Sequence, residues 1–346
     1  MLLRSPILLH YYLTYRCNCA CRFCDIWQSD TYNRNDFADP AQVRDNLKQG
    51  KKLGLRFVDF TGGEPLLHPQ LPELLDYANS QGYTTSVTTN TLLYPKLAEQ
   101  LRGKIRLLHF SIDSLDPQQH DDIRGKHVFQ SLMNAIDVAL SLGETPDLLY
   151  TVTPQNIDQL PALARFARKL KIILIVNPVF SHIQQHNLSD MDLDRIERYR
   201  KLPYVYINQA FVDLRRAGGN DNADPRCRVT SSTLVISPDN HLLLPCFHHY
   251  KTSLPIEGDL YNLYKSRRIS EERDMDGRYD FCSGCVLNCY MDPSFLYKSD
   301  ALFYASIWSK TQYAWYKYFH RPVSQWVNTK PAAAGAIAEQ IREGIA

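Results

Sequence analysis

Nine cysteines fall in two groups, and the first group has a spacing that suits metal chemistry. Cys17, Cys21 and Cys24 follow one another as C-x3-C-x2-C on one short segment. Three thiolates on one loop can hold three corners of a cubane cluster and leave the fourth iron without a protein ligand. A structural zinc site normally closes its fourth position, whereas an open iron can bind a substrate. We therefore predict a catalytic iron–sulfur site here, with Cys19 as a bystander or a swapped ligand.

The second group begins more than two hundred residues further along the chain. Cys227 and Cys246 have 18 residues between them, and Cys282, Cys285 and Cys289 follow as C-x2-C-x3-C. Four of these thiols around a hairpin could hold structural zinc, as in a zinc ribbon, or an auxiliary [4Fe–4S] cluster. Cys289 could replace Cys285, stay idle, or leave one iron of the cluster open to a substrate.

Two histidines, His248 and His249, come directly after this group's second cysteine. They could donate hydrogen bonds around the metal site or act as active-site bases. Two solvated histidines on a loop are an equally good interpretation. The sequence alone assigns no catalytic acid or base.

Composition and charge describe a globular protein rather than a disordered or fibrous one. The 346 residues are 44% hydrophobic and 22% charged, and the formal net charge is +2. This length suggests about two domains, and the balanced charge gives no reason to expect a nucleic-acid partner. No apolar run is long enough to span a membrane, and the N-terminal apolar run is too short for a signal peptide. The expected location is the cytoplasm, where clustered cysteines are more often metal ligands than disulfides.

The first two hundred residues alternate between short β-rich runs and amphipathic helical segments. This rhythm predicts an α/β fold with parallel strands and right-handed crossovers. Strands are expected at 7–13, 57–61, 84–88, 105–112, 148–153 and 172–176, and helices at about 40–53, 71–81, 94–102, 128–142, 157–169 and 189–202. Six such units are too few for an eight-stranded barrel, so we expect an open, partial (β/α)6 barrel. Its chemistry should lie on the loops that follow the strands' carboxyl ends.

Beyond residue 205 this rhythm ends, and we expect three domains or segments in all: 1–205, 206–292 and 293–346. A hairpin is expected from 233–236 and 241–244, inside a small cysteine-rich domain. The final segment is helical, and aromatic residues crowd its positions 293–326. Interleaved with Lys298, Lys310, Lys317 and Arg321, these aromatics could rest on a membrane surface or cover a lipid-like substrate. Alternatively, they pack the tail against the open side of the barrel.

These features resemble the radical S-adenosylmethionine (radical SAM) superfamily over roughly residues 8–205. The family's signature is the C-x3-C-x2-C spacing with an aromatic before the last cysteine, here Phe23. A second match is Thr61-Gly62-Gly63-Glu64-Pro65 after the second strand, where the family has its GGEP motif. The resemblance implies that Cys17, Cys21 and Cys24 hold a [4Fe–4S] cluster, and that the glycine segment binds the amino group of SAM.

The same resemblance implies further contacts to SAM. Ser111 and Asp113, at the end of the fourth strand, would contact the ribose. Asn90 and Arg124 are weaker candidates for the ribose and the carboxylate. In this family a reduced cluster cleaves SAM to a 5′-deoxyadenosyl radical, which abstracts a hydrogen atom from the substrate. An electron donor such as flavodoxin or ferredoxin would supply the electron.

The second cysteine group resembles the twitch domain, a shortened form of the SPASM extension behind many radical SAM barrels. This resemblance implies one auxiliary [4Fe–4S] cluster on Cys227, Cys246, Cys282 and Cys285. An oxidative change of a small molecule, lipid or peptide is then the leading reaction class. A redox-neutral addition or rearrangement is the runner-up, and a non-catalytic electron carrier or metal-dependent regulator is the alternative. No N-terminal module precedes the first strand, so a separate peptide-recognition domain is not expected.

Overall fold

The computed structural model describes residues 5–28, 37–180, 188–320 and 333–344. One sheet of ten strands organises them, in the order β10-β9-β8-β1-β2-β3-β4-β5-β6-β7. The strands are β1 (Leu8–Thr14), β2 (Phe57–Gly62), β3 (Thr84–Thr89), β4 (Leu107–Ser111), β5 (Asp147–Val152), β6 (Leu174–Pro178), β7 (Val205–Tyr206), β8 (Thr233–Ile236), β9 (His241–Leu244) and β10 (Thr252–Pro255). The pairs from β1 to β7 are all parallel, which confirms the expected α/β partial barrel.

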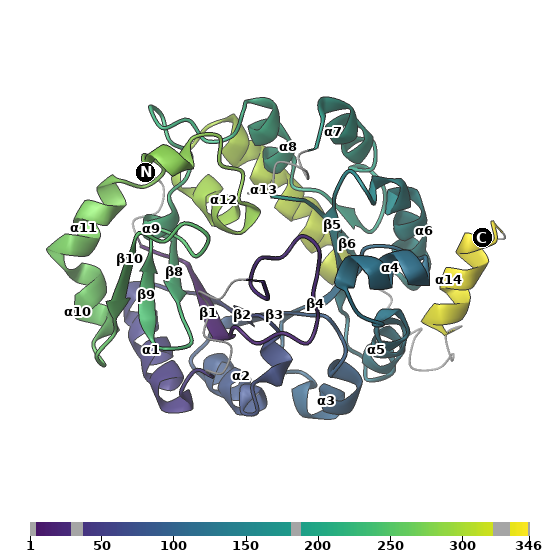
Figure 1. Cartoon of the computed structure of the whole chain (residues 1–346), viewed down its shortest axis with the longest axis horizontal. Helices are drawn as coiled ribbons and strands as arrows, with labels where there is room; N and C mark the ends of the chain where they lie inside the picture. The colour runs from purple at the N-terminus through teal and green to yellow at the C-terminus, as the bar shows by residue number, and fades with distance from the viewer. Residues whose placement is uncertain (1–4, 29–36, 181–187, 321–332, 345–346) are drawn as a thin grey trace.

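The helices between these strands lie on the outside of the curved sheet (Figure 1). They are α1 (Pro40–Leu53), α2 (Leu71–Ser80), α3 (Tyr94–Leu101), α4 (Pro117–Arg124), α5 (Phe129–Ser141), α6 (Leu160–Leu170) and α7 (Asp190–Glu197), with single 3-10 turns at η1 (Pro65–Leu67) and η2 (Ile157–Gln159). All but α4 correspond to a helix expected from the sequence. Helix α4 is short and polar, and its start is fixed because the Asp116 side chain accepts a hydrogen bond from the Gln119 N–H.

The barrel strands bury one face and leave the other partly open. In β5, Leu148, Tyr150 and Val152 are fully buried against the helices, whereas Leu149 and Thr151 between them are half-buried. Strands β3 and β6 show the same alternation. Because successive side chains of a strand point to opposite faces, the half-buried side chains share the inner side of the barrel, whose interior we call the chamber. The apolar runs of the sequence therefore do not mean complete burial on both faces.

The C-terminal part extends the same sheet, because β8 pairs in parallel with β1 on the edge opposite β2. Strands β8 and β9 form the expected hairpin, and β10 adds a third strand. The remaining helices are α8 (Gln209–Arg216), α9 (Val229–Ser232), α10 (Leu260–Lys265), α11 (Arg267–Asp274), α12 (Asn288–Ser294), α13 (Ala301–Ala314) and α14 (Ala334–Arg342). Two short 3-10 turns, η4 (Asp280–Cys282) and η5 (Phe295–Tyr297), and a π-helical turn, η6 (Trp315–Phe319), complete the described elements.

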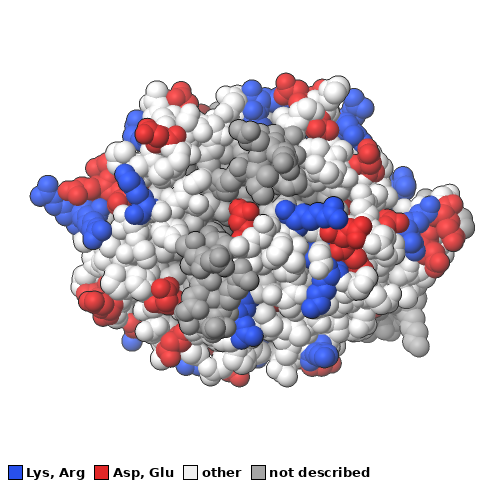
Figure 2. All heavy atoms as spheres, viewed as in Figure 1, with Lys and Arg blue, Asp and Glu red and all other residues white. Residues whose placement is uncertain are grey.

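Helix α14 closes the described chain on the outer side of α5 and α6, at the right of Figure 1. None of the helices described in the structure is long and apolar enough to cross a bilayer. On the face shown in Figure 2, basic and acidic side chains are interspersed rather than gathered by sign.

Candidate functional site

The first cysteine group lies on the loop that leaves the carboxyl end of β1. Two backbone hydrogen bonds tie this loop to the end of α4: Ala20 N–H donates to Arg124 O at 3.0 Å, and Arg22 N–H donates to Ile123 O at 3.0 Å. Inside the loop, the indole N–H of Trp27 donates to Cys21 O at 2.9 Å. Helix α4, which the sequence did not predict, therefore supports the loop that presents the three thiols.

Cys17, Cys21 and Cys24 lie near one another in one small cluster, together with Cys19. Burial raises the pKa of Cys17 to about 11 and that of Cys24 to about 12. Three clustered thiols on one loop suit an iron–sulfur cluster, whose iron would favour the thiolate form. Cys19 is buried beside Cys17 and Cys21, so the fourth thiol lies in the site rather than on the surface.

Two glycines allow the β2 loop to approach the cysteine loop closely. Gly62 has φ +141°, and a Cβ added there would lie 2.0 Å from Thr14 O. At Gly63 an added Cβ would lie 2.1 Å from Arg16 O. The approach is held by Gly63 N–H donating to Thr14 O and Glu64 N–H donating to Arg16 O, both at 2.8 Å. Any side chain at these positions would therefore push the two loops apart.

Glu64 is buried and joins the β2 loop to the end of β3. One carboxylate oxygen accepts from Leu66 N–H and the Thr89 hydroxyl, and the other accepts from Asn90 N–H. Burial raises the pKa of Glu64 to about 7, although these donors oppose the shift. Both oxygens of the Glu64 carboxylate accept hydrogen bonds, and they connect the loop after β2 to the end of β3.

Asn90 connects Glu64 to the cysteine loop, because its backbone N–H donates to Glu64 and its side chain contacts that loop. Its side-chain amide donates to Asn18 Oδ1 at 2.6 Å and lies 4.0 Å from Cys17 Sγ. The end of β3 therefore meets the first cysteine group through Asn90.

A buried ion pair between Asp113 and Arg124 lies beside the cysteine loop, on the side of β4. Arg124 Nε donates to Asp113 Oδ2 at 2.6 Å, and the guanidinium also lies 3.7 Å from Cys21 Sγ. Burial raises the pKa of Asp113, and the guanidinium beside it opposes that shift. Ser111 is buried at the carboxyl end of β4, two residues before Asp113. The structure thus brings Ser111, Asp113 and Arg124 to the same end of the sheet as the thiols.

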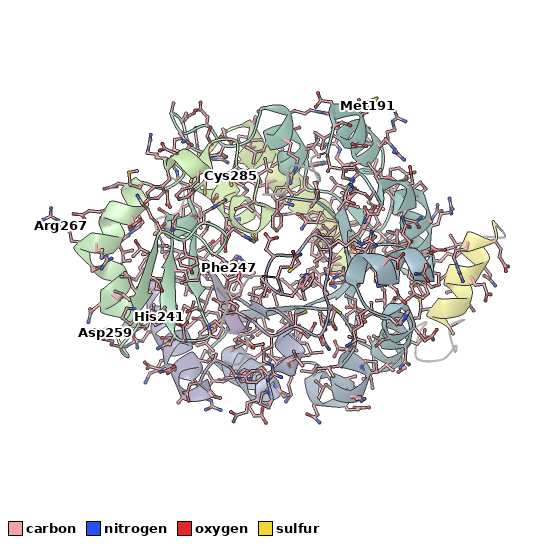
Figure 3. All side chains as sticks on the ribbon, viewed as in Figure 1. Met191, His241, Phe247, Asp259, Arg267 and Cys285 are labelled. Atoms are coloured by element: carbon pink, nitrogen blue, oxygen red, sulfur yellow. The ribbon has the colours of Figure 1, made fainter. Side chains whose placement is uncertain are left out.

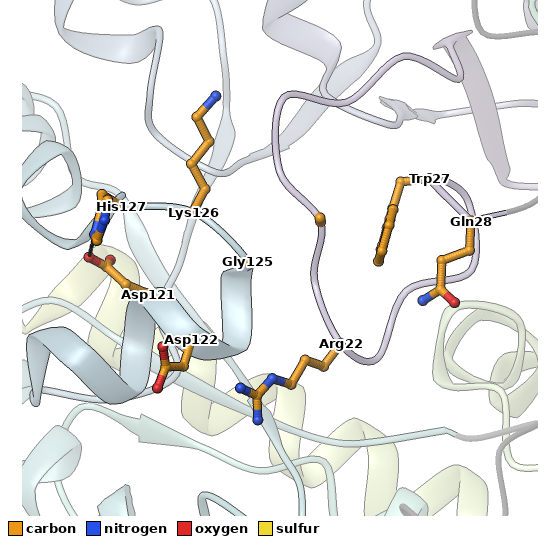
Figure 4. Close-up of a pocket in the computed structure, with 9 residues that line it drawn as sticks. Arg22, Trp27, Gln28, Asp121, Asp122, Gly125, Lys126 and His127 are labelled. Carbon is orange, nitrogen blue, oxygen red and sulfur yellow. Dashed lines mark hydrogen bonds and ion pairs between the residues drawn. The ribbon is translucent and has the colours of Figure 1, made fainter.

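A polar cleft of about 790 Å³ opens on the outer side of the cluster loop (Figure 4). Arg22, Trp27 and Gln28 line it from the loop, and Asp121, Asp122 and Lys126 are among the residues that line it from α4 and the turn that follows. In Figure 4 the Arg22 side chain extends toward Asp122 across this cleft. The cleft gives solvent-side access to the segment that carries the thiols.

The second cysteine group converges from three separate segments. Cys227, Cys246, Cys282 and Cys285 line one small cavity together with aromatic and aliphatic side chains. Cys289 is not among the residues that line this cavity. It lies on the barrel side, where its carbonyl oxygen is 3.4 Å from His10 Nε2. In the described part of the chain, no three His, Cys, Asp or Glu side chains are placed to hold a single metal ion.

Asn220 holds these segments together, and the sequence had marked its surroundings only as a loop. Its side-chain oxygen accepts from the N–H groups of Arg226 and Cys227, and its amide donates to Cys282 O and Gly277 O. Its backbone N–H donates to Cys285 O at 3.0 Å. Asn220 is 2% exposed, so these bonds have no competition from solvent.

Aromatic rings connect the two cysteine groups. Tyr12 of β1 stacks on Phe247 with ring centroids 4.2 Å apart, and Tyr15 touches both rings. Tyr15 comes two residues before Cys17, and Phe247 directly follows Cys246. Figure 3 shows Phe247 and Cys285 in the inner part of the molecule. These rings therefore pack the segment that precedes Cys17 against the segment that follows Cys246.

The two histidines after Cys246 lie among aromatic rings. His248 contacts Phe247, Phe180 and Tyr290, and His249 stacks on Phe281 at 5.2 Å. These contacts agree with a position beside the second cysteine group and argue against two fully solvated side chains.

Polar groups line the chamber inside the barrel, and sequence reasoning missed them. His10 Nδ1 of β1 lies 3.1 Å from Asp59 Oδ2 of β2, and both side chains are partly exposed to the chamber. Deeper in the barrel, Asp147 of β5 is fully buried and accepts from Tyr313 and Lys317, both at 2.6 Å. The sequence did contain a signal for these groups, because His10 and Asp59 interrupt otherwise apolar runs and Asp147 begins another.

One family model and several curated proteins are similar in sequence to part of this chain. Residues 11–167 match the family model of the Radical SAM superfamily. A probable GTP 3′,8-cyclase of Methanococcus maripaludis (strain C7) is 28% identical over 189 residues, which are 53% of this chain and 63% of the cyclase. The mycofactocin maturase MftC of Mycolicibacterium smegmatis is 29% identical over 170 residues, which are 48% of this chain and 43% of the maturase. The matches thus span less than two thirds of either relative's length.

Two solved structures share the fold. Streptococcus suis SuiB bound to S-adenosylmethionine superposes with a TM-score of 0.63 at 19% identity, covering 87% of this chain and 76% of SuiB. The anSMEcpe structure with bound AdoMet gives a TM-score of 0.61 at 16% identity, covering 97% of this chain and 99% of that one. At these identities the likeness concerns the fold alone.

Proposed function

We propose that this chain is a radical SAM enzyme whose first [4Fe–4S] cluster is bound by Cys17, Cys21 and Cys24. One observation carries the proposal: the cysteine loop, the glycine segment and the Asp113–Arg124 pair meet at one end of the parallel sheet. In a barrel of βα units, this carboxyl end is where ligands bind and chemistry occurs. A single structural metal ion would require none of the glycine and ion-pair framework.

The chain's own residues have distinct parts in this proposal. Gly62 and Gly63 bring backbone N–H and C=O groups close to the cluster loop, where the amino group of SAM would bind. Glu64 holds that turn in place, and Ser111 and Asn90 lie at strand ends suited to the ribose. Arg124 balances the charge of Asp113 and of the nearby thiolate. When bound, the reduced cluster and SAM together supply the 5′-deoxyadenosyl radical that abstracts hydrogen from the substrate.

For the second group we propose an auxiliary [4Fe–4S] cluster on Cys227, Cys246, Cys282 and Cys285. The shared cavity of these four thiols supports the ligand set, and the position of Cys289 outside it makes that residue a spare. The stack of Tyr12 and Phe247 offers a packed route for an electron between the two sites. An electron acceptor at this position favours oxidation of the substrate, by dehydrogenation or bond formation, over a redox-neutral rearrangement.

The substrate is proposed to be a polar small molecule or a peptide segment that enters the barrel chamber. The chamber presents His10, Asp59 and His109, which suit hydrogen-bonding groups better than a lipid chain. Among the relatives, MftC is a mycofactocin maturase, and SuiB has been solved bound to the precursor peptide SuiA. The cyclase relatives extend the range to nucleotides.

An electron donor such as flavodoxin or ferredoxin is proposed to approach at the polar cleft beside Arg22 and Lys126. This cleft lies directly outside the loop that carries the thiols, and electron transfer favours a short path to the cluster.

Anaerobic reconstitution with iron and sulfide, followed by SAM and dithionite, tests the proposal. We expect about eight iron atoms per chain, corresponding to two [4Fe–4S] clusters, together with 5′-deoxyadenosine. The variants Cys17→Ala, Cys21→Ala and Cys24→Ala should each lose 5′-deoxyadenosine formation, whereas Cys19→Ala is the matched control. Full clusters without any 5′-deoxyadenosine would instead favour an electron carrier, and bound zinc in place of iron would refute the cluster assignment.

A further inference from the structure

Helix α13 and the π-helical turn after it carry large apolar side chains on their outer side. Tyr304, Trp308, Trp315 and Phe319 are 64%, 70%, 54% and 74% exposed. Their spacings of four, seven and four residues place them along one face of a helix. We call these four residues the aromatic stripe.

The opposite side of the same helix is polar and faces the protein. The Ser309 hydroxyl accepts from Gln209 N–H, and Lys310 pairs with Asp292 at 2.6 Å. One and two turns further, Tyr313 and Lys317 both reach the buried Asp147. A surface helix of a globular domain normally buries its apolar face and exposes its polar one. Packing of the barrel therefore does not account for the aromatic stripe.

A groove of about 510 Å³ runs beside the stripe and is lined by two basic residues. Arg200 and Lys201, from the turn after α7, face Trp308 and Trp315 across it, and none of the described residues that line it is acidic. Gln312 Nε2 donates to Arg200 O at 3.1 Å, which fixes this turn against α13.

These two cations differ from those that the sequence had suggested for this surface. Lys298 pairs with Asp224, and Lys310 and Lys317 pair with Asp292 and Asp147. Arg321 lies outside the described residues. Within the described ranges, in contrast, neither the Arg200 nor the Lys201 side chain forms an ion pair.

We propose that the aromatic stripe docks on the surface of an anionic lipid bilayer, with Arg200 and Lys201 at the lipid phosphates. Tryptophan and tyrosine favour the boundary between acyl chains and headgroups, because their rings are apolar and their N–H and O–H groups are polar. Basic residues near an anionic membrane surface are attracted to its phosphate groups. Arg200 and Lys201, which have no acidic neighbour among the described residues of the groove, are therefore complementary in charge to the phosphates of an anionic bilayer. The binding would be peripheral, through one helical face, and does not depend on the proposed radical chemistry.

Co-sedimentation of the full-length, reconstituted protein with vesicles tests this inference. The vesicles would contain phosphatidylcholine alone or an equal mixture of phosphatidylcholine and phosphatidylglycerol. We expect binding to be at least about tenfold tighter to the anionic vesicles and to weaken with salt. The variants Trp308→Ala/Trp315→Ala and Arg200→Glu/Lys201→Glu should each weaken it about tenfold or more.

Two control positions, Met191 and Arg267, lie at outer edges of the molecule (Figure 3). Met191→Ala removes another exposed apolar side chain, and Arg267→Glu/Arg268→Glu makes the same change of charge on α11. Both controls should bind like the wild type. All the variants alter surface positions, so unchanged thermal unfolding and 5′-deoxyadenosine yields would verify that the fold is intact.

Equal binding of the wild type and Trp308→Ala/Trp315→Ala to anionic vesicles would overturn the proposal, as would no binding by the wild type. A dimer in solution that dissociates in Trp308→Ala/Trp315→Ala would assign the stripe to a second copy of the chain instead. Light scattering at several protein concentrations distinguishes that outcome.

Discussion

The two cysteine groups are assembled in opposite ways. The first takes its three thiols from one continuous segment, Cys17 to Cys24, and needs neighbouring loops only to hold that segment in shape. The second collects thiols from three segments on both sides of the β8–β9 hairpin, and Asn220 joins them. The first site should therefore be most sensitive to changes that push the neighbouring β2 loop away, whereas the second should be most sensitive to loss of its connecting hydrogen bonds.

The largest effect is expected from Gly62→Ala, which acts on the first site only. The added Cβ would lie 2.0 Å from Thr14 O, so the β2 loop must move away from the cysteine loop. We expect a loss of about 3 kcal/mol or more in the free energy of unfolding, and no 5′-deoxyadenosine formation. Denaturant titration and product analysis measure the two effects.

Gly103→Ala is the matched control for this change. Gly103 also has positive φ, +74°, but nothing lies within 4 Å of an added Cβ. The cost should be only about 1 kcal/mol of backbone strain. Equal losses in the two variants would show that close approach of the loops does not matter.

Asn220→Ala should act on the second site and spare the first. It leaves buried N–H and C=O groups near Cys227 and Cys282 without partners, at a cost of about 2–3 kcal/mol. We expect about half of the iron to be lost, with 5′-deoxyadenosine formation retained. The neighbouring Asp221→Ala, which removes one exposed hydrogen bond, is the control. Full iron in Asn220→Ala would contradict the framework role.

Glu64 gives the first site a dependence on pH through a buried carboxyl with a raised pKa. The second site has a buried carboxyl of its own, Asp276, whose pKa burial raises to about 6, so the two sites should lose stability over different ranges of pH. The folded pKa of Glu64, about 7, lies above the unfolded value, so the protonated carboxyl favours the folded state. The resulting stabilisation is complete below about pH 4.5 and is lost as the pH rises through about 7. Glu64→Gln should therefore flatten the profile of thermal stability between pH 5 and about 7.5. Exposed Glu73→Gln should leave the profile unchanged, and an unchanged profile in Glu64→Gln would refute the assignment.

The smallest effect is expected in the aromatic contact between the two sites. Tyr12→Leu removes the stack on Phe247 and should lower the unfolding free energy by about 1 kcal/mol, with iron content unchanged. Tyr12→Phe keeps the ring and loses only the hydroxyl's hydrogen bond with Tyr290, so it separates the contribution of the stack from that of this bond. Loss of iron in Tyr12→Leu would show that the stack supports a cluster as well as the core.

Local patterns predicted the parts of this molecule that depend on neighbouring residues. The six expected strands and the helices between them follow from apolar periodicity, and the first cysteine spacing lies within one loop. Helix α4 escaped prediction because its sequence, Pro117–Arg124, is polar and has little apolar periodicity. Its start depends on a cap, and its importance depends on Arg124 reaching Asp113 and Cys21.

Contacts between residues distant in the sequence could not be predicted from local patterns. The parallel pairing of β8 with β1, the hydrogen bonds from Asn220 to Gly277, Cys282 and Cys285, and the ion pair of Lys317 with Asp147 all join residues far apart in the chain. The lysines of the aromatic segment illustrate this limit. Their composition suggested a basic membrane surface, yet Lys310 and Lys317 form ion pairs with Asp292 and the buried Asp147.

The most direct test of the account compares Cys21→Ala with Cys246→Ala, each reconstituted anaerobically. Both variants should retain about half of the wild-type iron, because each loses one of two separate [4Fe–4S] clusters. Only Cys246→Ala should still convert SAM to 5′-deoxyadenosine with dithionite. Persistent 5′-deoxyadenosine formation by Cys21→Ala, or its complete loss in a Cys246→Ala protein that keeps the first cluster, would contradict the division of the molecule into a SAM-cleaving site and an auxiliary site.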